Sequence, residues 1–180
     1  LFFWWVFLGA WVAVRLSSPG PAISAQERVG RKAKTFTCYK FRTMRNGAEQ
    51  ERDLLLHVNE QDGPAFKIRT DPRVTRLGRM LRRTSLDELP QLICVLRGEM
   101  SLVGPRPVPM GELRRYGAQQ SKYLALRPGL TGLWQVSGRN ALPYSARVAL
   151  DVRYSQQLNL IGDLRILLAT LREICRLSGR

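Results

Sequence analysis

The chain carries the stretch Thr84-Ser85-Leu86-Asp87-Glu88-Leu89-Pro90 near the middle of its 180 residues. Ser85 and Glu88 have the spacing of a capping box, in which each side chain hydrogen-bonds a free backbone amide at a helix start. Pro90 lacks an amide hydrogen and is tolerated only in the first turn of a helix. The stretch therefore predicts that a helix begins here, whichever residue is the cap, with Asp87 and Glu88 in its first turn.

Two roles are open for this pair of carboxylates. Acidic residues are common in the first turn of a helix, where they only stabilise its end. Alternatively, the helix dipole and the neighbouring Arg82 and Arg83 lower the pKa of both carboxyls and keep them ionised, as a nucleophile or a magnesium ligand requires.

Upstream of this stretch, residues 26–29 and 35–44 predict two strands of a hairpin, separated by a short polar turn. Alternation along the second strand places Lys40 and Arg42 on one face and aromatic side chains on the other. The two cations therefore project together. They form either a solvated face or part of a site for an anion.

The spacing of apolar residues predicts two amphipathic helices, and a polar segment precedes the first of them. Residues 72–83 predict a helix with Pro72 at its first position and a basic flank that suits an anionic bilayer or a phosphate backbone. Residues 164–177 carry an apolar stripe at helical spacing, which faces either the protein core, the commoner case, or lipid. Residues 45–63 are polar, with a short helix expected at 49–58, and no chemistry is assigned to them.

The N-terminal residues 1–14 are apolar and uncharged. A helix of this length reaches about 21 Å, which is short of a hydrocarbon core of about 30 Å. Two interpretations remain open: a buried core helix, or one arm of a membrane-inserted element that returns to water at Arg15 and the turn 17–21. Because the first residue is Leu1, we expect the chain to belong to a longer protein.

Composition excludes several classes of protein. With 44% hydrophobic and 24% charged residues, the chain is not disordered. A single histidine, three scattered cysteines and no GxxxxGK[ST] loop argue against zinc sites, a disulfide framework and P-loop nucleotidases. The formal charge of +15 predicts a polyanionic partner: nucleic acid, an anionic membrane face or a phosphorylated substrate.

Six blocks, in order along nearly the whole chain, carry a family resemblance. They are SSPGP (17–21), QERVG (26–30), YKFRTM (39–44), TSLDELPQL (84–92), MSLVGPRP (100–107) and RPGLTGLWQVSGRN (127–140). In these blocks the chain resembles the bacterial sugar transferases, the monotopic polyprenyl-phosphate phosphoglycosyl transferases. The resemblance implies transfer of a sugar 1-phosphate from a UDP-sugar to polyprenyl phosphate, usually undecaprenyl phosphate, in the initiation of exopolysaccharide, capsule or O-antigen synthesis.

The resemblance also implies roles for individual residues. Asp87 would attack the sugar-bearing phosphate and form a covalent phospho-sugar intermediate. Glu88, together with Asp87, would hold Mg²⁺, the implied cofactor. Further residues match basic and acidic positions of the family site: Arg106, Lys40, Arg42 and Arg82 as phosphate-binding residues, and Asp151 as a further acid.

The implied architecture is α+β and mostly helical: a monotopic, membrane-associated domain with a small β-hairpin and amphipathic surface helices. Residues 1–16 would be a truncated arm of a re-entrant membrane helix, whose first half with its proline break is absent here, and residues 17–180 a cytoplasmic catalytic domain. The resemblance places such a protein at the cytoplasmic face of the bacterial inner membrane, in contact with lipid.

Rival functions and open questions remain at this point. A catalytically silent lipid-binding scaffold of the same family is the alternative to an enzyme. A nucleic-acid-binding domain leaves the carboxylate pair and the aromatic N-terminus unexplained, so we expect no nucleic-acid partner. The sugar, the role of residues 45–63 and the oligomeric state, a homo-oligomer included, stay open.

Overall fold

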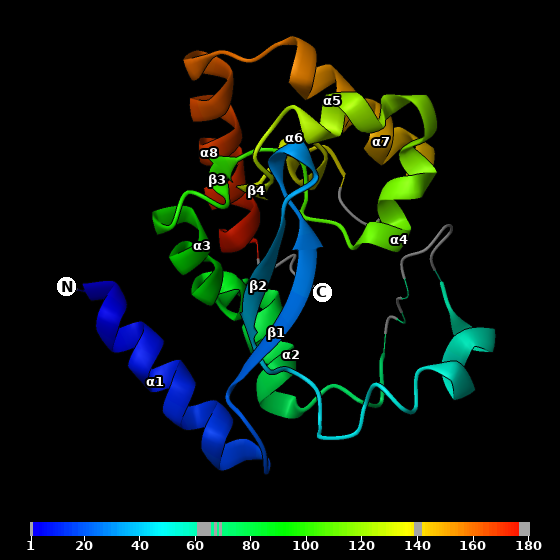
Figure 1. Ribbon diagram of the computed structural model, residues 1–180. Coiled ribbons are helices and arrows are strands. Elements are labelled where there is room, and N and C mark those ends of the chain that lie inside the picture. Colours follow the sequence, from blue (N-terminus) through cyan, green and yellow to red (C-terminus); the bar gives the residue numbers. More distant parts are fainter. Residues whose placement is uncertain (1, 61–65, 67, 69, 139–141, 177–180) are drawn as a thin grey trace.

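A computed structural model of the chain describes residues 2–60, 66, 68, 70–138 and 142–176 (Figure 1). Within these residues the fold is α+β and mostly helical, as expected from the sequence. The α-helices are α1 Phe2–Ser17, α2 Arg76–Arg83, α3 Leu92–Leu96, α4 Met110–Leu113, α5 Gln120–Leu124, α6 Leu133–Val136, α7 Tyr144–Gln156 and α8 Leu160–Cys175. The 3₁₀-helices and strands are η1 Arg31–Ala33, η2 Asp53–Val58, η3 Leu86–Gln91 and η4 Arg114–Gln119, with β1 Ile23–Val29, β2 Thr35–Phe41, β3 Ser101–Val103 and β4 Gly129–Thr131.

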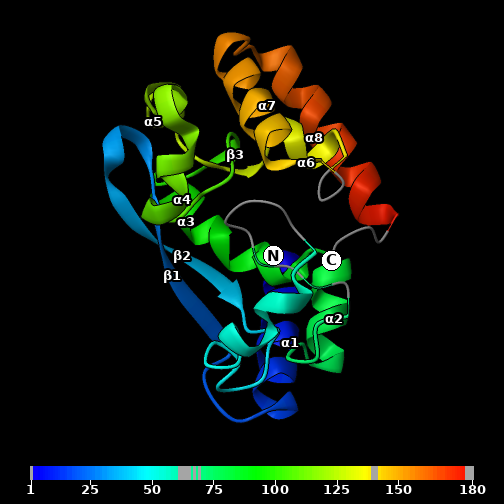
Figure 2. The same ribbon diagram turned by 90° about the vertical axis from the view of Figure 1, so that its right-hand side faces the viewer.

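The predicted hairpin is confirmed and forms the long axis of the fold. β1 and β2 pair antiparallel from Ile23↔Phe41 to Val29↔Thr35. The connection turns through Lys32 and Ala33, which both have positive φ. Figures 1 and 2 show α1 and α2 near one end of this hairpin and α7 and α8 near the other.

A second, parallel pair of strands was not predicted. β3 and β4 pair at Ser101↔Gly129 and Val103↔Thr131. The backbones lie so close that a Cβ on Gly129 would come within 2.1 Å of the amide nitrogen of Gly104. Strands of three residues are too short to show an alternating pattern, and their pairing requires a glycine at this crossing.

Helix α2 begins four residues later than the sequence predicted. Thr75, not Pro72, precedes the first turn, and its hydroxyl accepts a hydrogen bond from the amide of Gly78 at 2.9 Å. Arg73 instead lies in the preceding loop, buried, with its guanidinium bonded to both carboxylate oxygens of Asp71 at 2.9 and 2.7 Å. The buried ion pair therefore stabilises a turn at residues 72 and 73, where periodicity predicted that the helix had already begun.

Helix α1 is buried on one side only, so each interpretation of the N-terminal segment describes part of it. Val14 is 1% exposed and packs with Phe41 and Leu81 in a core cluster. On the opposite side Trp4 and Trp5 are 66% and 70% exposed. Among the described residues, no helix combines the length and apolarity needed to cross a bilayer. Insertion of residues 1–16 into a membrane, and the boundary at residue 17, stay predictions.

Helix α8 does not bury the stripe that its spacing suggested. Ile166 is the buried residue of this helix, and it packs with Val103 and Tyr154. Leu164, Leu168 and Leu171 of the expected stripe are more than half exposed, and Leu177 lies outside the described residues. The helix is rotated so that Thr170 meets Thr131 of β4 through a 2.7 Å hydrogen bond between their hydroxyls. Periodicity located an apolar face but could not say what covers it.

The polar segment 45–63 contains less helix than expected. Turns are followed by η2, which covers only the second half of the predicted 49–58 helix. Residues 61–63 lie outside the described residues.

Candidate active site

The carboxylate pair lies where α2 ends and η3 begins. Ser85, between the two helices, has a left-handed backbone conformation (φ 57°), which separates the end of α2 from the start of η3. A helix does begin at Leu86, but it is a 3₁₀-helix, and the predicted capping box is absent because the Ser85 side chain caps no amide. Such a conformation at a residue with a Cβ costs about 1 kcal/mol or more, which the surrounding contacts must offset.

Glu88 connects this turn to the hairpin. Its carboxylate forms an ion pair with Lys40 of β2 at 2.6 Å, and both side chains are about two-thirds buried. The pair joins residues 48 positions apart in the chain. It therefore confirms that Lys40 faces the carboxylates, which strand alternation alone did not establish.

Asp87 is perturbed in the opposite direction from the one predicted. Burial first, and the adjacent charge of Glu88 second, raise its pKa to about 6, although Lys40 and Arg82 act to lower it. Desolvation of the charged form outweighs the helix end and the cations. Arg82 lies close by and donates from Nε to the hydroxyl of Thr43 at 2.9 Å.

Arg106 is held between two buried prolines, Pro105 and Pro107, while its own side chain is exposed. Its guanidinium lies 5.7 Å from the centre of the Trp134 ring. The charge of Arg106 acts on both Arg28 and Asp151, which places these groups in one electrostatic neighbourhood. A rigid turn that carries an exposed, stacked guanidinium suits recognition of phosphate.

Asp151 is 4% exposed in the middle of α7. One carboxylate oxygen accepts a hydrogen bond from the hydroxyl of Tyr116 at 2.8 Å, and the other has no partner among the described residues. Burial raises the pKa of Asp151 to about 7, against the hydrogen bond of Tyr116 and the charge of Arg106. The acid lies beside Arg106, apart from the Asp87 end of the site.

Arg42 contacts the end of α1. Its guanidinium donates to the carbonyl oxygens of Val14, Ser18 and Pro19 at 3.2, 2.6 and 2.7 Å. Arg42 follows the last residue of β2, and its amide continues the hairpin by donating to the carbonyl oxygen of Ala22 at 2.8 Å. It lines the same groove as Lys40 and Glu88, and its predicted contact with substrate stays a prediction.

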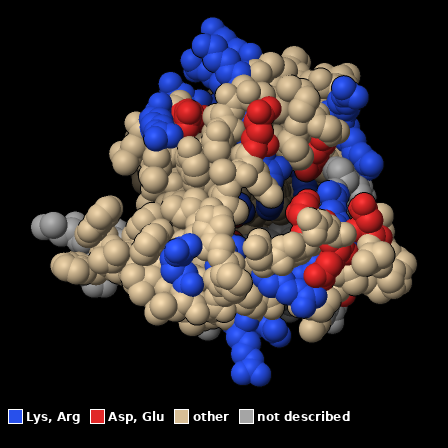
Figure 3. Space-filling model, turned by 60° about the horizontal axis from the view of Figure 1, so that its bottom comes forward, with Lys and Arg blue, Asp and Glu red and all other residues tan. Residues whose placement is uncertain are grey.

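One groove connects these groups. Its lining includes Lys40, Arg82, Asp87, Arg106 and Asp151, and basic residues outnumber acidic ones along it. Figure 3 shows Lys and Arg atoms inside a hollow whose rim carries Asp and Glu atoms. The groove therefore offers a carboxylate nucleophile and several cations to an anionic ligand.

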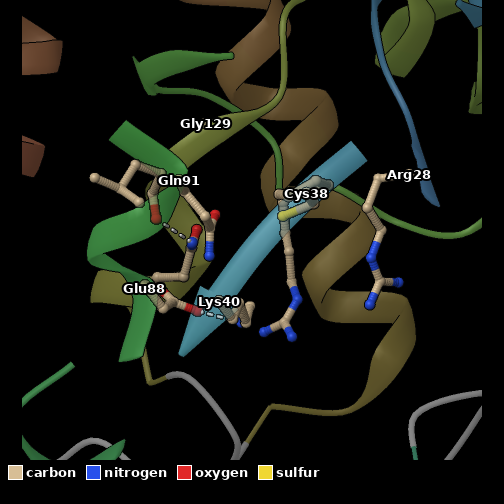
Figure 4. A pocket seen from close by; sticks show the side chains of 10 residues that line it. Arg28, Cys38, Lys40, Glu88, Gln91 and Gly129 are labelled. Atoms are coloured by element: carbon tan, nitrogen blue, oxygen red, sulfur yellow. Dashed lines mark hydrogen bonds and ion pairs between the residues drawn. The ribbon is translucent and has the colours of Figure 1, made fainter. Parts of the chain in front are cut away.

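Sequence reasoning missed two residues of the pocket within this groove. Arg28 of β1 and Gln91 of η3 line it together with Lys40, Glu88 and Arg106 (Figure 4). Both stand inside blocks that carried the family resemblance, QERVG and TSLDELPQL. Applying the alternation of Lys40 across the hairpin would have placed Arg28 on the same face.

The carboxylates fit a magnesium ion in number. Among the described residues no group of three or more His, Cys, Asp or Glu comes together. Mg²⁺ commonly binds through only one or two carboxylates, and substrate phosphates and water complete its coordination. Asp87 and Glu88 meet that requirement.

Comparison with known proteins identifies the family to which this site belongs. The profile of the bacterial sugar transferases matches residues 1–177. The chain belongs to this family. An undecaprenyl-phosphate galactose phosphotransferase of Salmonella typhimurium is 48% identical over 164 residues, which are 89% of this chain and 34% of that protein.

Two further relatives are matched over more of their own length. The exopolysaccharide production protein ExoY of Rhizobium meliloti is 43% identical over 178 residues, 97% of this chain and 79% of that protein. A UDP-glucose:undecaprenyl-phosphate glucose-1-phosphate transferase of Caulobacter vibrioides is 44% identical over 175 residues, 92% of this chain and 61% of that protein. The chain spans about a third of the length of several curated relatives, the Salmonella typhimurium protein among them.

Proposed function

We propose that this chain transfers a sugar 1-phosphate from a UDP-sugar to undecaprenyl phosphate or a similar polyprenyl phosphate, releasing UMP. The product would begin synthesis of an exopolysaccharide, capsule or O-antigen. Family membership supports the proposal, as do the names of relatives that are undecaprenyl-phosphate sugar phosphotransferases or act in exopolysaccharide production.

The observation that carries the proposal is the position of Asp87. It lies beside Glu88, within the fields of Lys40 and Arg82, on a groove with an excess of cations. A carboxyl with a pKa of about 6 is mostly ionised at pH 7, yet more basic than an ordinary aspartate. That combination suits a nucleophile that attacks phosphorus.

The reaction balances as a double displacement. A carboxylate oxygen of Asp87 bonds to the sugar-bearing phosphorus, and the bond from that phosphorus to the oxygen of UMP breaks. An oxygen of the polyprenyl phosphate then bonds to the same phosphorus, and the carboxylate of Asp87 leaves. At the start of each step the nucleophile and the phosphate that it attacks are both anions and repel each other. Lys40, Arg82 and Arg106 would weaken this repulsion with their positive charges.

Asp87 and Glu88 would hold Mg²⁺. When bound, the metal supplies positive charge that partly neutralises the diphosphate of the donor.

We also propose that the protein works at the cytoplasmic face of the inner membrane. The acceptor is a lipid, and the exposed tryptophans of α1 offer an apolar surface of the kind that binds at a membrane interface. Contact with inner-membrane lipid and the re-entrant arm at residues 1–16 belong to this proposal.

The test is UMP release in nanodiscs that contain undecaprenyl phosphate and Mg²⁺, with a panel of UDP-sugars. We expect release with one donor and a loss of about a thousandfold or more in Asp87→Asn, because the amide is no nucleophile. Without acceptor, the intact mass of the wild-type protein should rise by one phospho-sugar, and that of Asp87→Asn should not.

Asp53→Asn is the matched control, since Asp53 is also an acid in the first turn of a 3₁₀-helix and is exposed. It should release UMP at the wild-type rate. No release from any donor by the wild-type protein would contradict the proposal and favour the lipid-binding scaffold instead.

A further inference from the structure

Gln91 presents a buried donor to the pocket. Its side chain is 2% exposed, and its Nε2 has no hydrogen-bond partner among the described residues. A buried amide hydrogen without an acceptor destabilises a fold, so its retention calls for a reason. Gln91 lines the pocket with Glu88, three residues earlier on η3, which suggests that a ligand supplies the missing acceptor.

Arg28 approaches the same pocket from the hairpin. The strand register sets Ser24 opposite Lys40 and Gln26 opposite Cys38, so Arg28 shares a face with both β2 residues. Figure 4 shows Arg28 on one side of the pocket and Gln91 and Glu88 on the other, with Cys38 and Lys40 between them.

No carboxylate among the described residues forms an ion pair with Arg28. Its hydrogen bond in this part of the chain goes to the side-chain oxygen of Gln26. Burial lowers the pKa of Arg28, and the charge of Arg106 lowers it further, while Glu112 acts in the opposite direction. Two guanidinium groups that repel each other at the edge of a pocket would both be stabilised by a bound anion.

Arg28, Gln91 and Arg106 line the small pocket, and Asp87 lines the wider groove but not that pocket. The Arg28 set, defined as Arg28, Gln91 and Arg106, therefore lies to one side of the carboxylate. Phosphoryl transfer proceeds in line, with the nucleophile and the leaving oxygen on opposite sides of phosphorus. With the sugar-bearing phosphate next to Asp87, the leaving phosphate points toward the Arg28 set.

We propose that Arg28 and Gln91 bind the phosphate that leaves as UMP, and that the phosphate of the polyprenyl acceptor then occupies the same position. The inference rests on the proposed function. In-line geometry requires the second half of it: an acceptor that displaces Asp87 must enter from the side that UMP left. In each catalytic cycle Arg28 and Gln91 would therefore bind two phosphate monoesters in turn, first UMP and then the polyprenyl phosphate.

The experiment measures UMP binding by calorimetry to the protein in nanodiscs without acceptor. Arg28→Gln should raise the Kd for UMP about tenfold or more, and Arg28→Lys should restore part of the loss, because an ammonium keeps the charge but not the planar fork. Affinity for uridine, which lacks the phosphate, should change less than twofold, roughly the scatter expected when no phosphate contact is involved.

Gln91→Met removes the amide at similar volume. We expect weaker UMP binding together with an unfolding temperature of the free protein equal to or above that of wild type, since the unpaired donor is gone. A residue with a purely structural role would lose stability instead. Arg31→Gln is the matched control, because Arg31 is an exposed arginine of the same hairpin that does not line the pocket. Arg31→Gln should leave the Kd for UMP and the Kd for uridine unchanged.

A second arm adds undecaprenyl phosphate to the nanodiscs, which should raise the apparent Kd for UMP in proportion to its concentration. Unchanged UMP affinity in Arg28→Gln and Gln91→Met, or equal losses for UMP and uridine, would overturn the assignment. Absence of competition would overturn the shared position. The parent proposal fails separately, by absence of UMP release from the wild-type protein with every donor.

Discussion

Burial controls the chemistry of single side chains in this site. Asp151 shows the effect most clearly. The hydrogen bond of Tyr116 and the charge of Arg106 lower its pKa, the charge of Glu112 raises it, and burial, which also raises it, is the largest effect. Its pKa of about 7 lies well above the ordinary value of 3.8 for an aspartate. A carboxyl with a raised pKa stabilises the folded state at low pH and loses that contribution as the pH rises through the folded pKa.

We therefore predict that Asp151→Asn changes the pH dependence of stability. The asparagine resembles the protonated acid, so the variant and the wild type should differ least below about pH 4, where the acid is protonated in both the folded and the unfolded state. The advantage of the variant should grow between the ordinary pKa of 3.8 and the folded pKa of about 7. Above pH 7 it should level off at roughly 2–4 kcal/mol, because the wild type alone buries a charge. Thermal unfolding from pH 3 to 9 checks this, and parallel curves for the two proteins would contradict it.

At the scale of elements, close backbone contact positions α2 and hence the carboxylates that follow it. Gly78 lies against the backbone that follows β2. A Cβ at Gly78 would be 2.0 Å from the carbonyl oxygen of Thr43. The amide of Thr75 also donates to that carbonyl at 3.0 Å. No side-chain adjustment relieves a clash with backbone, so α2 can approach the hairpin only through a glycine.

Gly78→Ala should therefore destabilise the protein by about 3 kcal/mol or more, against the small gain that alanine gives in an open helix. Gly111→Ala in α4 is the matched control, because a Cβ there meets nothing within 4 Å. Urea unfolding of both variants decides the matter. If Gly78→Ala unfolds at the wild-type urea concentration, the packing described here is wrong.

At the scale of the whole molecule, apolar faces remain uncovered on two helices. Trp4, Trp5 and Leu16 of α1 are at least 66% exposed, and the outer side of α8 exposes several leucines. The chain also carries a net charge of +15. Apolar area and positive charge together favour adsorption to an anionic bilayer.

We predict that vesicles containing anionic lipid bind the protein and shift its tryptophan emission to shorter wavelength. Trp4→Ser combined with Trp5→Ser should weaken binding about tenfold or more, because each indole removes a large apolar area from water. Leu54→Ser, on the equally exposed η2, serves as control and should bind as wild type does. Equal affinity of all three proteins in a vesicle sedimentation assay would argue against α1 as the contact surface.

The residues quoted from the sequence identified most of the site but not its internal arrangement. One groove is lined by all seven predicted site residues: Asp87, Glu88, Lys40, Arg42, Arg82, Arg106 and Asp151. Arg42 differs from the others because its guanidinium donates hydrogen bonds to backbone carbonyls at the end of α1. Arg28 and Gln91 were overlooked because an arginine in a strand and a glutamine in a first turn are ordinary residues there. Residues 139 and 140 of the last quoted block lie outside the described residues.

The sequence by itself determined the hairpin, the helix start at Leu86 and the amphipathic character of α8, since these depend on alternation, a proline and spacing among near neighbours. Only the tertiary structure decided the pairing of β3 with β4, the rotation of α8 and the raised pKa of Asp87. Each of these depends on contacts between distant segments, such as Lys40 with Glu88 across 48 positions. Desolvation in particular is a property of the packed molecule, because no local pattern states how much water a carboxylate will lose.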